Sequence, residues 1–345
     1  MKKYIAFDKT TRKWHLPVVA GLAVGIPMIF GWYIDNFDAG KLASLAGLSI
    51  LYIQSDKLSE RMMLLMTCCF GIMSSYAIGL LFSFNPFFAP LALGFLSFFI
   101  HYSLHKLHLT RPPGNFFFIM LASTAICTPF DMDSIPTKIG YIALGTIFTC
   151  SLGFVYSLLT LKKQGESSAI RVKDSYTNIV ESIIFGVFIL ISLAIAFGLE
   201  LDNPYWMPIS CLAVMQGSNS KHTWKRGTQR IIGTFIGLGI TWLIAYNNPS
   251  PLFMVISITL LQMIVEFLVV RNYGIAVIFI TVLTIFLSES GGQLSQDTDQ
   301  VFLARLFDIS IGSIIGIIGG WALYHEKIHY YATQQLQKFK NEEDL

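Results

Sequence analysis

Two arginines stand where the chain could bind an anion. Arg111 and Arg271 each come directly before an apolar run, and a glycine, Gly114 or Gly274, follows each of them three residues later. A helix N-terminus favours an anion because its first backbone N–H groups have no partner within the helix and its dipole is positive there. A guanidinium beside it adds a planar pair of donors that fits a carboxylate. We expect a carboxylate contact at both arginines; the alternative is that each anchors its helix at the lipid headgroups.

Two glutamines close the shortest apolar runs of the chain. Gln54 ends the run near 40–54, and Gln216 ends the run near 204–217, which is interrupted by Pro208. Short, proline-broken helices bring polar groups and backbone ends to the middle of a membrane, where transporters bind their substrates. We therefore expect Gln54 and Gln216 to form hydrogen bonds with the carboxylate of a substrate.

The composition places these residues in a membrane protein. The chain has 345 residues, of which 54% are hydrophobic and 13% are charged, and its mean hydropathy is +0.60. A water-soluble core cannot bury that much apolar surface, so the bilayer must be the solvent. We expect an all-α polytopic membrane protein with about twelve transmembrane helices. The candidate runs lie near residues 17–34, 40–54, 62–83, 86–104, 115–130, 137–161, 178–198, 204–217, 230–246, 250–269, 272–288 and 303–324.

The positive charges predict the orientation in the membrane. Cytoplasmic connections of membrane proteins are enriched in lysine and arginine. All but three of these residues lie before the first run, in every second connection or after the last run; the exceptions are Lys41, Lys138 and Arg305. Twelve spans with both termini in the cytoplasm fit this alternation. The net charge of +3 is then an orientation signal, and no nucleic-acid partner is expected.

Landmarks of the first half recur in the second half in the same order and at the same spacing. The matched residues are Arg111, Gly114 and Thr124 with Arg271, Gly274 and Thr284, and Lys138, Gly145 and Gly153 with Arg305, Gly312 and Gly320. Such matches indicate a duplication, and an even number of spans in each half makes the two repeats parallel. We expect six-helix membrane repeats at 1–161 and 178–324, a cytoplasmic linker at 162–177 and a cytoplasmic tail at 325–345.

Lys138 and Arg305 lie on the face of the membrane that is otherwise depleted of cations. Asp308 follows Arg305 by one helical turn. Two interpretations stay open. Arg305 and Asp308 neutralise each other, or Lys138 and Arg305 make a second anion contact while Asp308 carries a proton.

No metal or other cofactor is expected from the sequence. His101, His105 and His108 share a helical face, but no carboxylate or cysteine accompanies them, which favours a solvated helix end over a metal site. The five cysteines fall inside apolar runs and are typical of small buried hydrophobes. Lys106 and Glu266 stand five residues before the paired arginines with opposite charge. That placement fits either a salt bridge between the halves or chance divergence.

The basic turn after the run near 204–217 carries a family resemblance. Trp206-Met-Pro and the later segment Lys225-Arg226-Gly-Thr-Gln-Arg230-Ile-Ile-Gly233 resemble the signature of the fusaric acid resistance family, which belongs with the aromatic acid exporters. The resemblance implies a bacterial inner-membrane protein that moves aromatic or other organic carboxylates outward, with Arg226 and Arg230 as further substrate contacts. It extends to plant aluminium-activated malate transporters, whose six-helix unit would be present twice here. Family members usually add a cytoplasmic helical domain, for which the expected linker and tail are too short.

These observations predict a transporter that exports small organic anions such as aromatic carboxylates, along a pathway lined by the second, fifth, eighth and eleventh helices. Its partners would be the anion and the lipid bilayer, with a homo-oligomer or an accessory protein as further candidates. Two alternatives stay open: a passive organic-anion channel, and a membrane assembly subunit that transports nothing. An enzyme is not expected, because the sequence offers no buried combination of histidine, aspartate and serine.

Overall fold

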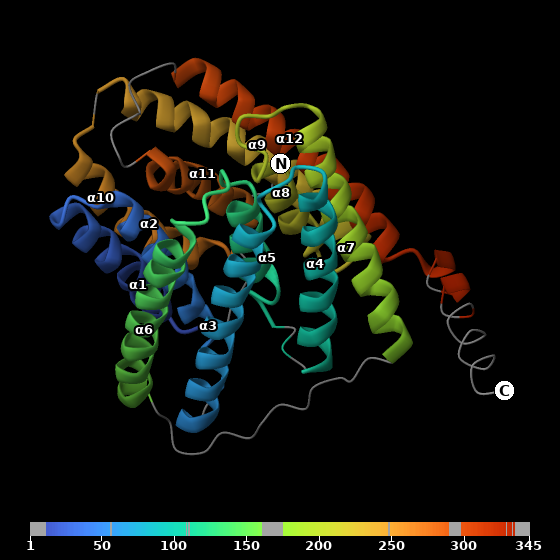
Figure 1. Cartoon of the computed structure of the whole chain (residues 1–345), viewed down its shortest axis with the longest axis horizontal. Helices are drawn as coiled ribbons and strands as arrows, with labels where there is room; N and C mark the ends of the chain where they lie inside the picture. Colours follow the sequence, from blue (N-terminus) through green and yellow to red (C-terminus); the bar gives the residue numbers. More distant parts are fainter. Residues whose placement is uncertain are drawn as a thin grey trace. The chain divides into compact units, whose positions relative to one another are not determined.

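The computed structural model describes residues 12–55, 57–107, 109, 111–160, 175–247, 249–289, 298–328, 330–332 and 334. His108, the expected linker up to residue 174 and the end of the expected tail lie outside these ranges. The described residues form twelve α-helices and one short 3-10 helix (Figure 1). Their bounds are α1 His15–Tyr33, α2 Phe37–Gly47, η1 Leu48–Tyr52, α3 Leu58–Leu81, α4 Phe88–Lys106, α5 Phe116–Ile126, α6 Ile135–Thr160, α7 Ser175–Gly198, α8 Trp206–Met215, α9 Ser220–Ala245, α10 Pro251–Leu268, α11 Tyr273–Glu289 and α12 Thr298–Leu323.

Each of the twelve apolar runs coincides with a helix, which confirms the prediction of an all-α membrane protein. Among the described residues, eight helices are long and apolar enough to cross a membrane: α1, α3, α4, α6, α7, α9, α10 and α12. The helices α2, α5 and α8 have 11, 11 and 10 residues, roughly half of a spanning helix. Helix α11 has 17 residues. Twelve complete spans therefore stay a prediction.

Local sequence explains how the short helices begin and end. The Asn36 side chain accepts a hydrogen bond of 3.0 Å from the Ala39 N–H and caps α2, which tightens into η1 after Gly47. Before α5, the Gly114 N–H donates to the Arg111 carbonyl at 2.9 Å and closes a turn. Gly114 has a φ of 55°, in the left-handed region that favours glycine. The backbone conformation thus explains why a glycine stands three residues after Arg111.

The chain folds into two compact units, each of which combines segments from both expected halves. Among the described residues, unit 1 comprises those within Met1–Ala77, Phe130–Glu166 and Gln229–Phe307, and unit 2 those within Ile78–Pro129, Ser167–Thr228 and Asp308–Leu345. Unit 1 therefore holds α1, α2, α6, α10 and α11, and unit 2 holds α4, α5, α7 and α8. Helices α3, α9 and α12 each contribute residues to both.

In unit 1, α1 packs against α2 and α10, α2 against α6, and α10 against α11. Small residues allow these close approaches: a Cβ at Gly25 of α1 would collide with Thr259 of α10, and a Cβ at Gly145 of α6 would collide with the Ala43 backbone of α2. Met28 is fully buried in the apolar cluster that α1 forms with α10 and α11. Dispersion contacts in this cluster hold the unit together, because lipid offers no hydrophobic driving force between helices.

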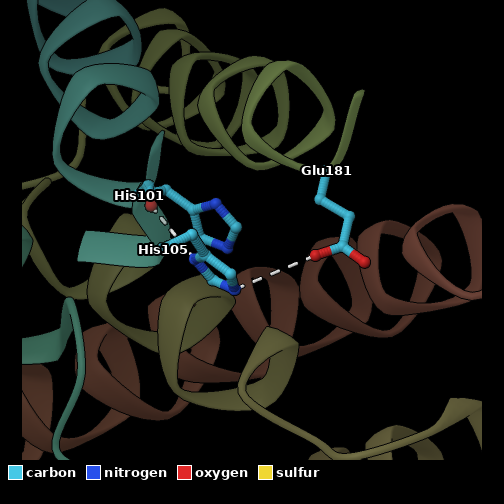
Figure 2. A group of neighbouring side chains, drawn as sticks. All are labelled: His101, His105 and Glu181. Atoms are coloured by element: carbon cyan, nitrogen blue, oxygen red, sulfur yellow. Dashed lines mark hydrogen bonds and ion pairs between the residues drawn. The ribbon is translucent and has the colours of Figure 1, made fainter. Parts of the chain in front are cut away.

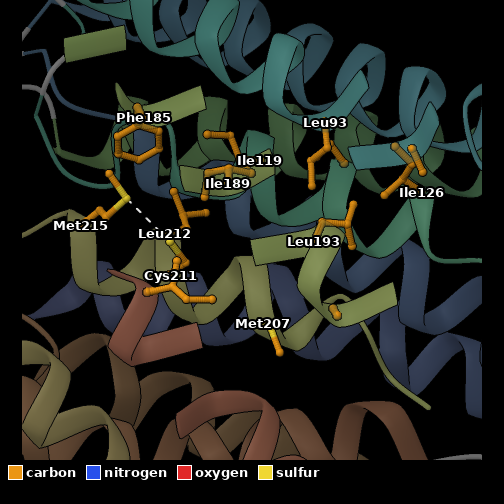
Figure 3. Packing of buried hydrophobic residues seen from close by; sticks show 14 residues of the cluster. Leu93, Ile119, Ile126, Phe185, Ile189, Leu193, Met207, Cys211, Leu212 and Met215 are labelled. Carbon is orange, nitrogen blue, oxygen red and sulfur yellow. Dashed lines mark hydrogen bonds between the residues drawn. The ribbon is translucent and has the colours of Figure 1, made fainter. Parts of the chain in front are cut away.

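In unit 2, α8 is the buried centre. All nine residues from Met207 to Met215 are buried, and they pack among side chains of α4, α5 and α7 (Figure 3). Helix α4 runs along α7, where Gly94 and Gly186 let the two backbones approach. A helix that is apolar on every side belongs in an interior. The short helix that the sequence singled out is thus enclosed by protein within this unit.

Candidate functional site

The end of α8 contacts the turn that opens α5, within unit 2. The Gln216 side-chain amide donates hydrogen bonds to the Asn115 carboxamide oxygen at 3.2 Å and to the Pro113 carbonyl at 3.4 Å. Asn115 is buried, whereas Arg111, which opens the same turn, is exposed. The structure thus brings Gln216 together with the Arg111–Asn115 corner. Amide, helix N-terminus and guanidinium are the donor types that suit a carboxylate.

The matching corner of unit 1 lies between α10 and α11. The Arg271 guanidinium donates to the Phe267 carbonyl at 2.5 Å and lies 3.6 Å from the centroid of the Phe267 ring. The Asn272 side chain caps α11 by accepting the Ile275 N–H at 3.1 Å. Arg271 is therefore held by the last turn of α10 through a helix-end hydrogen bond and a cation–π contact. It stands beside the α11 N-terminus, as the spacing predicted.

Arg230 is buried next to this corner of unit 1. Its guanidinium donates to the Tyr273 hydroxyl at 3.3 Å, and only 5% of the residue is exposed. The neighbouring Gln229 side chain lies against Gly274, where a Cβ would come within 3.0 Å of the amide nitrogen. The glycine that follows Arg271 thus makes room for α9, and the structure brings Arg230 close to the Arg271 corner.

Two arginines that follow the short helical segments, Arg226 after α8 and Arg61 after η1, each donate a hydrogen bond to a backbone carbonyl. Arg226 donates to the Ala213 carbonyl in α8 at 3.1 Å. In unit 1, Arg61 is buried and donates to the Ser55 carbonyl and, at 3.0 Å, to the Thr160 hydroxyl. The last carbonyls of a helix have no partner within it, so Arg226 has a structural role at the end of α8. Gln54, which follows η1, is half-buried.

Arg305 and Asp308 lie buried in the first half of α12, with 6% and 1% of each residue exposed. The Arg305 guanidinium donates to the Thr284 hydroxyl of α11 at 2.6 Å. Lys138 is partly exposed in the first turn of α6. Lys41 is the third cation expected on the membrane face that is otherwise depleted of cations. Its position has a structural explanation, because its ammonium donates to the Ser288 carbonyl at the end of α11, 2.8 Å away.

The structure contains an ion pair that the sequence did not predict. Arg12 lies 2.9 Å from the Glu266 carboxylate, and Gln262 donates to the same carboxylate at 3.3 Å. Glu266 is buried, with 5% exposed, so the cation compensates a charge removed from water. A salt bridge with Lys106 was one open interpretation of Glu266; the structure gives it Arg12 as an ion-pair partner. No sequence signal linked these residues, because Arg12 fitted the orientation pattern.

The expectation that no carboxylate accompanies the histidines of α4 is wrong. Glu181 of α7 lies 3.9 Å from the His105 imidazole, and His101 is buried rather than solvated. The sequence hid this arrangement because Glu181 belongs to a helix that lies far along the chain.

An apolar groove of about 290 Å³ lies between α9, α10 and α11 in unit 1. Its walls are aliphatic and aromatic apart from Ser257; they include Ile240, Phe253, Leu260, Phe279 and Phe286. A cleft without cationic or amide donors does not suit a carboxylate. It does not belong to the candidate anion site.

Comparisons with known proteins agree with the sequence resemblance. A family model described as "Fusaric acid resistance protein-like" matches residues 189–319, from within α7 to within α12. The chain is 33% identical over 160 residues to the "Uncharacterized membrane protein YvaC" of Bacillus subtilis (strain 168), a stretch that covers 46% of this chain and 24% of that protein. No solved structure matches the chain. The resemblance to the fusaric acid resistance family is therefore confirmed.

Proposed function

We propose, from the resemblance to the fusaric acid resistance family, that this protein is a transporter that exports small organic anions such as aromatic carboxylates across a bacterial inner membrane. The observation that carries the proposal is the contact of Gln216 with the Arg111–Asn115 corner. It joins the end of a buried short helix to a helix N-terminus flanked by an arginine. Transporters bind anions at such broken-helix ends.

Four short helices support the proposed pathway. Among the described α-helices, α2, α5, α8 and α11 are those that do not reach 18 residues. They take the second and fifth places in each expected six-helix repeat. Corresponding packing supports the repeats. Gly145 packs on Ala43 of α2, and Gly312 packs on Met207 and Ser210 of α8.

Corresponding hydrogen bonds support the repeats as well. Ser44 of α2 donates to the Val24 carbonyl of α1 at 2.7 Å, and Cys211 of α8 donates to the Phe188 carbonyl of α7 at 3.8 Å. Helices α2 and α8 therefore each bind the preceding helix through a side-chain hydrogen bond to a backbone carbonyl. Two parallel repeats account for this correspondence.

We assign roles to the candidate residues on this basis. Arg111 and Arg271 attract the carboxylate from the cytoplasm, Gln54 and Gln216 form hydrogen bonds with it, and apolar walls accept its aromatic or alkyl body. Further contacts come from the cations Lys138, Arg305, Arg226 and Arg230. Asp308 carries the coupled proton, because buried carboxylates within membrane helices often belong to proton pathways.

The test is anion efflux from proteoliposomes loaded with labelled benzoate. In the Arg111→Gln/Arg271→Gln double variant, we expect efflux to fall by on the order of tenfold or more, since one charge-assisted hydrogen bond contributes about 1.5–3 kcal/mol. Lys221→Gln is the matched control, because Lys221 is an exposed cation of a basic turn. Unchanged efflux in a folded double variant would remove both arginines from the pathway.

The same vesicles separate transport from the two alternatives. A passive channel would give a benzoate current that follows voltage and does not respond to a pH gradient. An assembly subunit would give no benzoate flux and would copurify with a partner in fixed stoichiometry. Flux that responds to the pH gradient and that protein-free vesicles do not show supports the transporter.

A further inference from the structure

Two histidines and one glutamate gather between α4 and α7 in unit 2. His101 and His105 lie one helical turn apart on α4, and Glu181 of α7 points toward their imidazoles (Figure 2). One nitrogen of each imidazole and one carboxylate oxygen lie within 4.8 Å of one another. We propose that His101, His105 and Glu181 bind a divalent transition-metal ion such as Zn²⁺. The site is separate from the proposed anion contacts and does not depend on which substrate is transported.

The hydrogen bonds around the imidazoles place the lone pairs on the side of the site. His105 Nδ1 lies 3.0 Å from the His101 carbonyl oxygen. A carbonyl only accepts, so this nitrogen carries the proton and the Nε2 atom, which is 3.9 Å from Glu181, carries the lone pair. A backbone carbonyl is a usual second partner of a metal-binding histidine.

The same reasoning applies to His101. Its Nδ1 lies 3.0 Å from the Ser182 hydroxyl, and that hydroxyl donates its own proton to the Asn178 carbonyl at 2.7 Å. Ser182 must therefore accept from His101, which leaves the His101 lone pair on Nε2. Both imidazoles are thus in the tautomer that presents Nε2 to a metal ion, and both are oriented by a second partner.

Packing restricts the site further. The two imidazoles stack with centroids 4.2 Å apart, and Phe185 stacks on His101 at 4.7 Å. The side chains of His105 and Glu181 are 20% and 10% exposed, so two of the three ligands are not fully buried. Asn178 also donates to the Tyr102 carbonyl at 3.3 Å and ties α7 to α4 beside the site. Small movements would bring the three ligand atoms to the distance of about 2 Å that zinc requires.

The ligand set indicates the class of metal. Two imidazole nitrogens and one carboxylate are ligands of Zn²⁺ and neighbouring transition metals, whereas Mg²⁺ and Ca²⁺ prefer oxygen. Three protein ligands leave a fourth position for water. A bound ion would join the end of α4 to α7 in place of the long contact between His105 and Glu181.

The charge of Glu181 also acts on Tyr324, which follows α12. Burial raises the pKa of the Tyr324 phenol, and the nearby negative charge of Glu181 raises it further. The Tyr324 hydroxyl donates to the Gly217 carbonyl, directly after Gln216. An ion that neutralises Glu181 would therefore remove a negative charge that acts on Tyr324.

Co²⁺ titration of the full-length protein in detergent tests the proposal, because Co²⁺ replaces Zn²⁺ and absorbs visible light when it has four or five ligands. The protein must carry an affinity tag without histidines. We expect one Co²⁺ per chain with such a spectrum. His105→Gln and Glu181→Gln should each weaken binding by about tenfold or more, whereas His222→Gln, a change at a histidine bound to Ser218, should leave binding unchanged.

A second variant keeps the proposal testable if a ligand variant fails to fold. Ser182→Ala retains all three ligands and removes the partner that orients His101, so Co²⁺ binding should weaken by about tenfold with the spectrum retained. Three results would overturn the site: the absence of a Co²⁺ spectrum in the wild type, wild-type affinity in Glu181→Gln, or equal loss of binding in His222→Gln.

Discussion

The side-chain amide of Gln216 donates a hydrogen bond to the carboxamide oxygen of Asn115, 3.2 Å away. This contact joins residues about a hundred positions apart and connects the end of α8 to the start of α5. Two roles are therefore available to Gln216, one that positions the two helices and one that binds the substrate. They make different predictions for two substitutions.

Gln216→Glu separates the two roles. The carboxylate can accept from the Asn115 amide after that amide rotates, so the helix contact survives, but the new negative charge repels an anion. We expect benzoate efflux to fall by tenfold or more with a change in unfolding free energy of under about 1 kcal/mol. Gln216→Ala should lower both the benzoate efflux and the unfolding free energy, because it leaves the buried Asn115 oxygen without its donor. Normal efflux in Gln216→Glu would exclude a substrate contact for Gln216 and leave only its role in positioning the two helices.

The pair of Arg12 and Glu266 should contribute strongly to stability. Arg12→Met leaves a buried carboxylate uncompensated, which costs about 3–5 kcal/mol. The double variant Arg12→Met/Glu266→Gln should regain most of that loss. Lys57→Met is the control, because Lys57 and Glu60 form an exposed pair at 3.1 Å that contributes at most about 1 kcal/mol. Chemical unfolding in detergent measures all of these variants, and similar losses in Arg12→Met and Lys57→Met would contradict the assignment.

Asp308→Asn tests proton coupling. The amide keeps the size of the side chain but cannot exchange a proton, so efflux driven by a pH gradient should fall to the rate without the gradient. Exchange of labelled for unlabelled benzoate at equal pH should continue, since it needs no net proton movement. A variant that still responds to the gradient would assign coupling to another group.

Helix packing at Gly312 is open to a matched glycine test. A Cβ at Gly312 of α12 would collide with the Met207 carbonyl of α8, whereas a Cβ at Gly239 of α9 would meet nothing within 4 Å. Gly312→Ala should therefore destabilise the protein by about 1–3 kcal/mol. Gly239→Ala should be neutral or stabilise it by up to about 1 kcal/mol through helix propensity. Equal thermal stability of the two variants would argue against the packing of α12 on α8.

The sequence predicted helix positions well because apolar runs and their breaks are local signals. Pro208 and Gln216 marked α8 as short. The same signals could not distinguish a spanning helix from a buried half-length one, since both are apolar. The helix lengths in the structure distinguish the two kinds, since α2, α5 and α8 have only 10 or 11 residues.

Side-chain partners far apart in the chain were not predictable in the same way. Arg12 and Glu266, or His101 and Glu181, become neighbours through helix packing, and one sequence holds no record of which helices pack. Arg12 also fitted the pattern of cytoplasmic cations, so nothing in the sequence indicated an ion pair. The matched arginines at 111 and 271 were found because repetition is visible without knowing any contact.

The composition of unit 2 has a consequence for synthesis. Its helices α4 and α5 leave the ribosome well before α7 and α8, with which they pack. Helix α8, with 10 residues, is too short to be retained by the bilayer as an independent stop-transfer segment. We therefore expect α8 to enter the membrane together with its neighbours. Until then, the faces of α4 and α5 that pack in the α8 cluster would contact lipid. We therefore expect unit 2 to assemble after its helices have inserted, and a chain truncated before α8 to lack the buried centre of the unit.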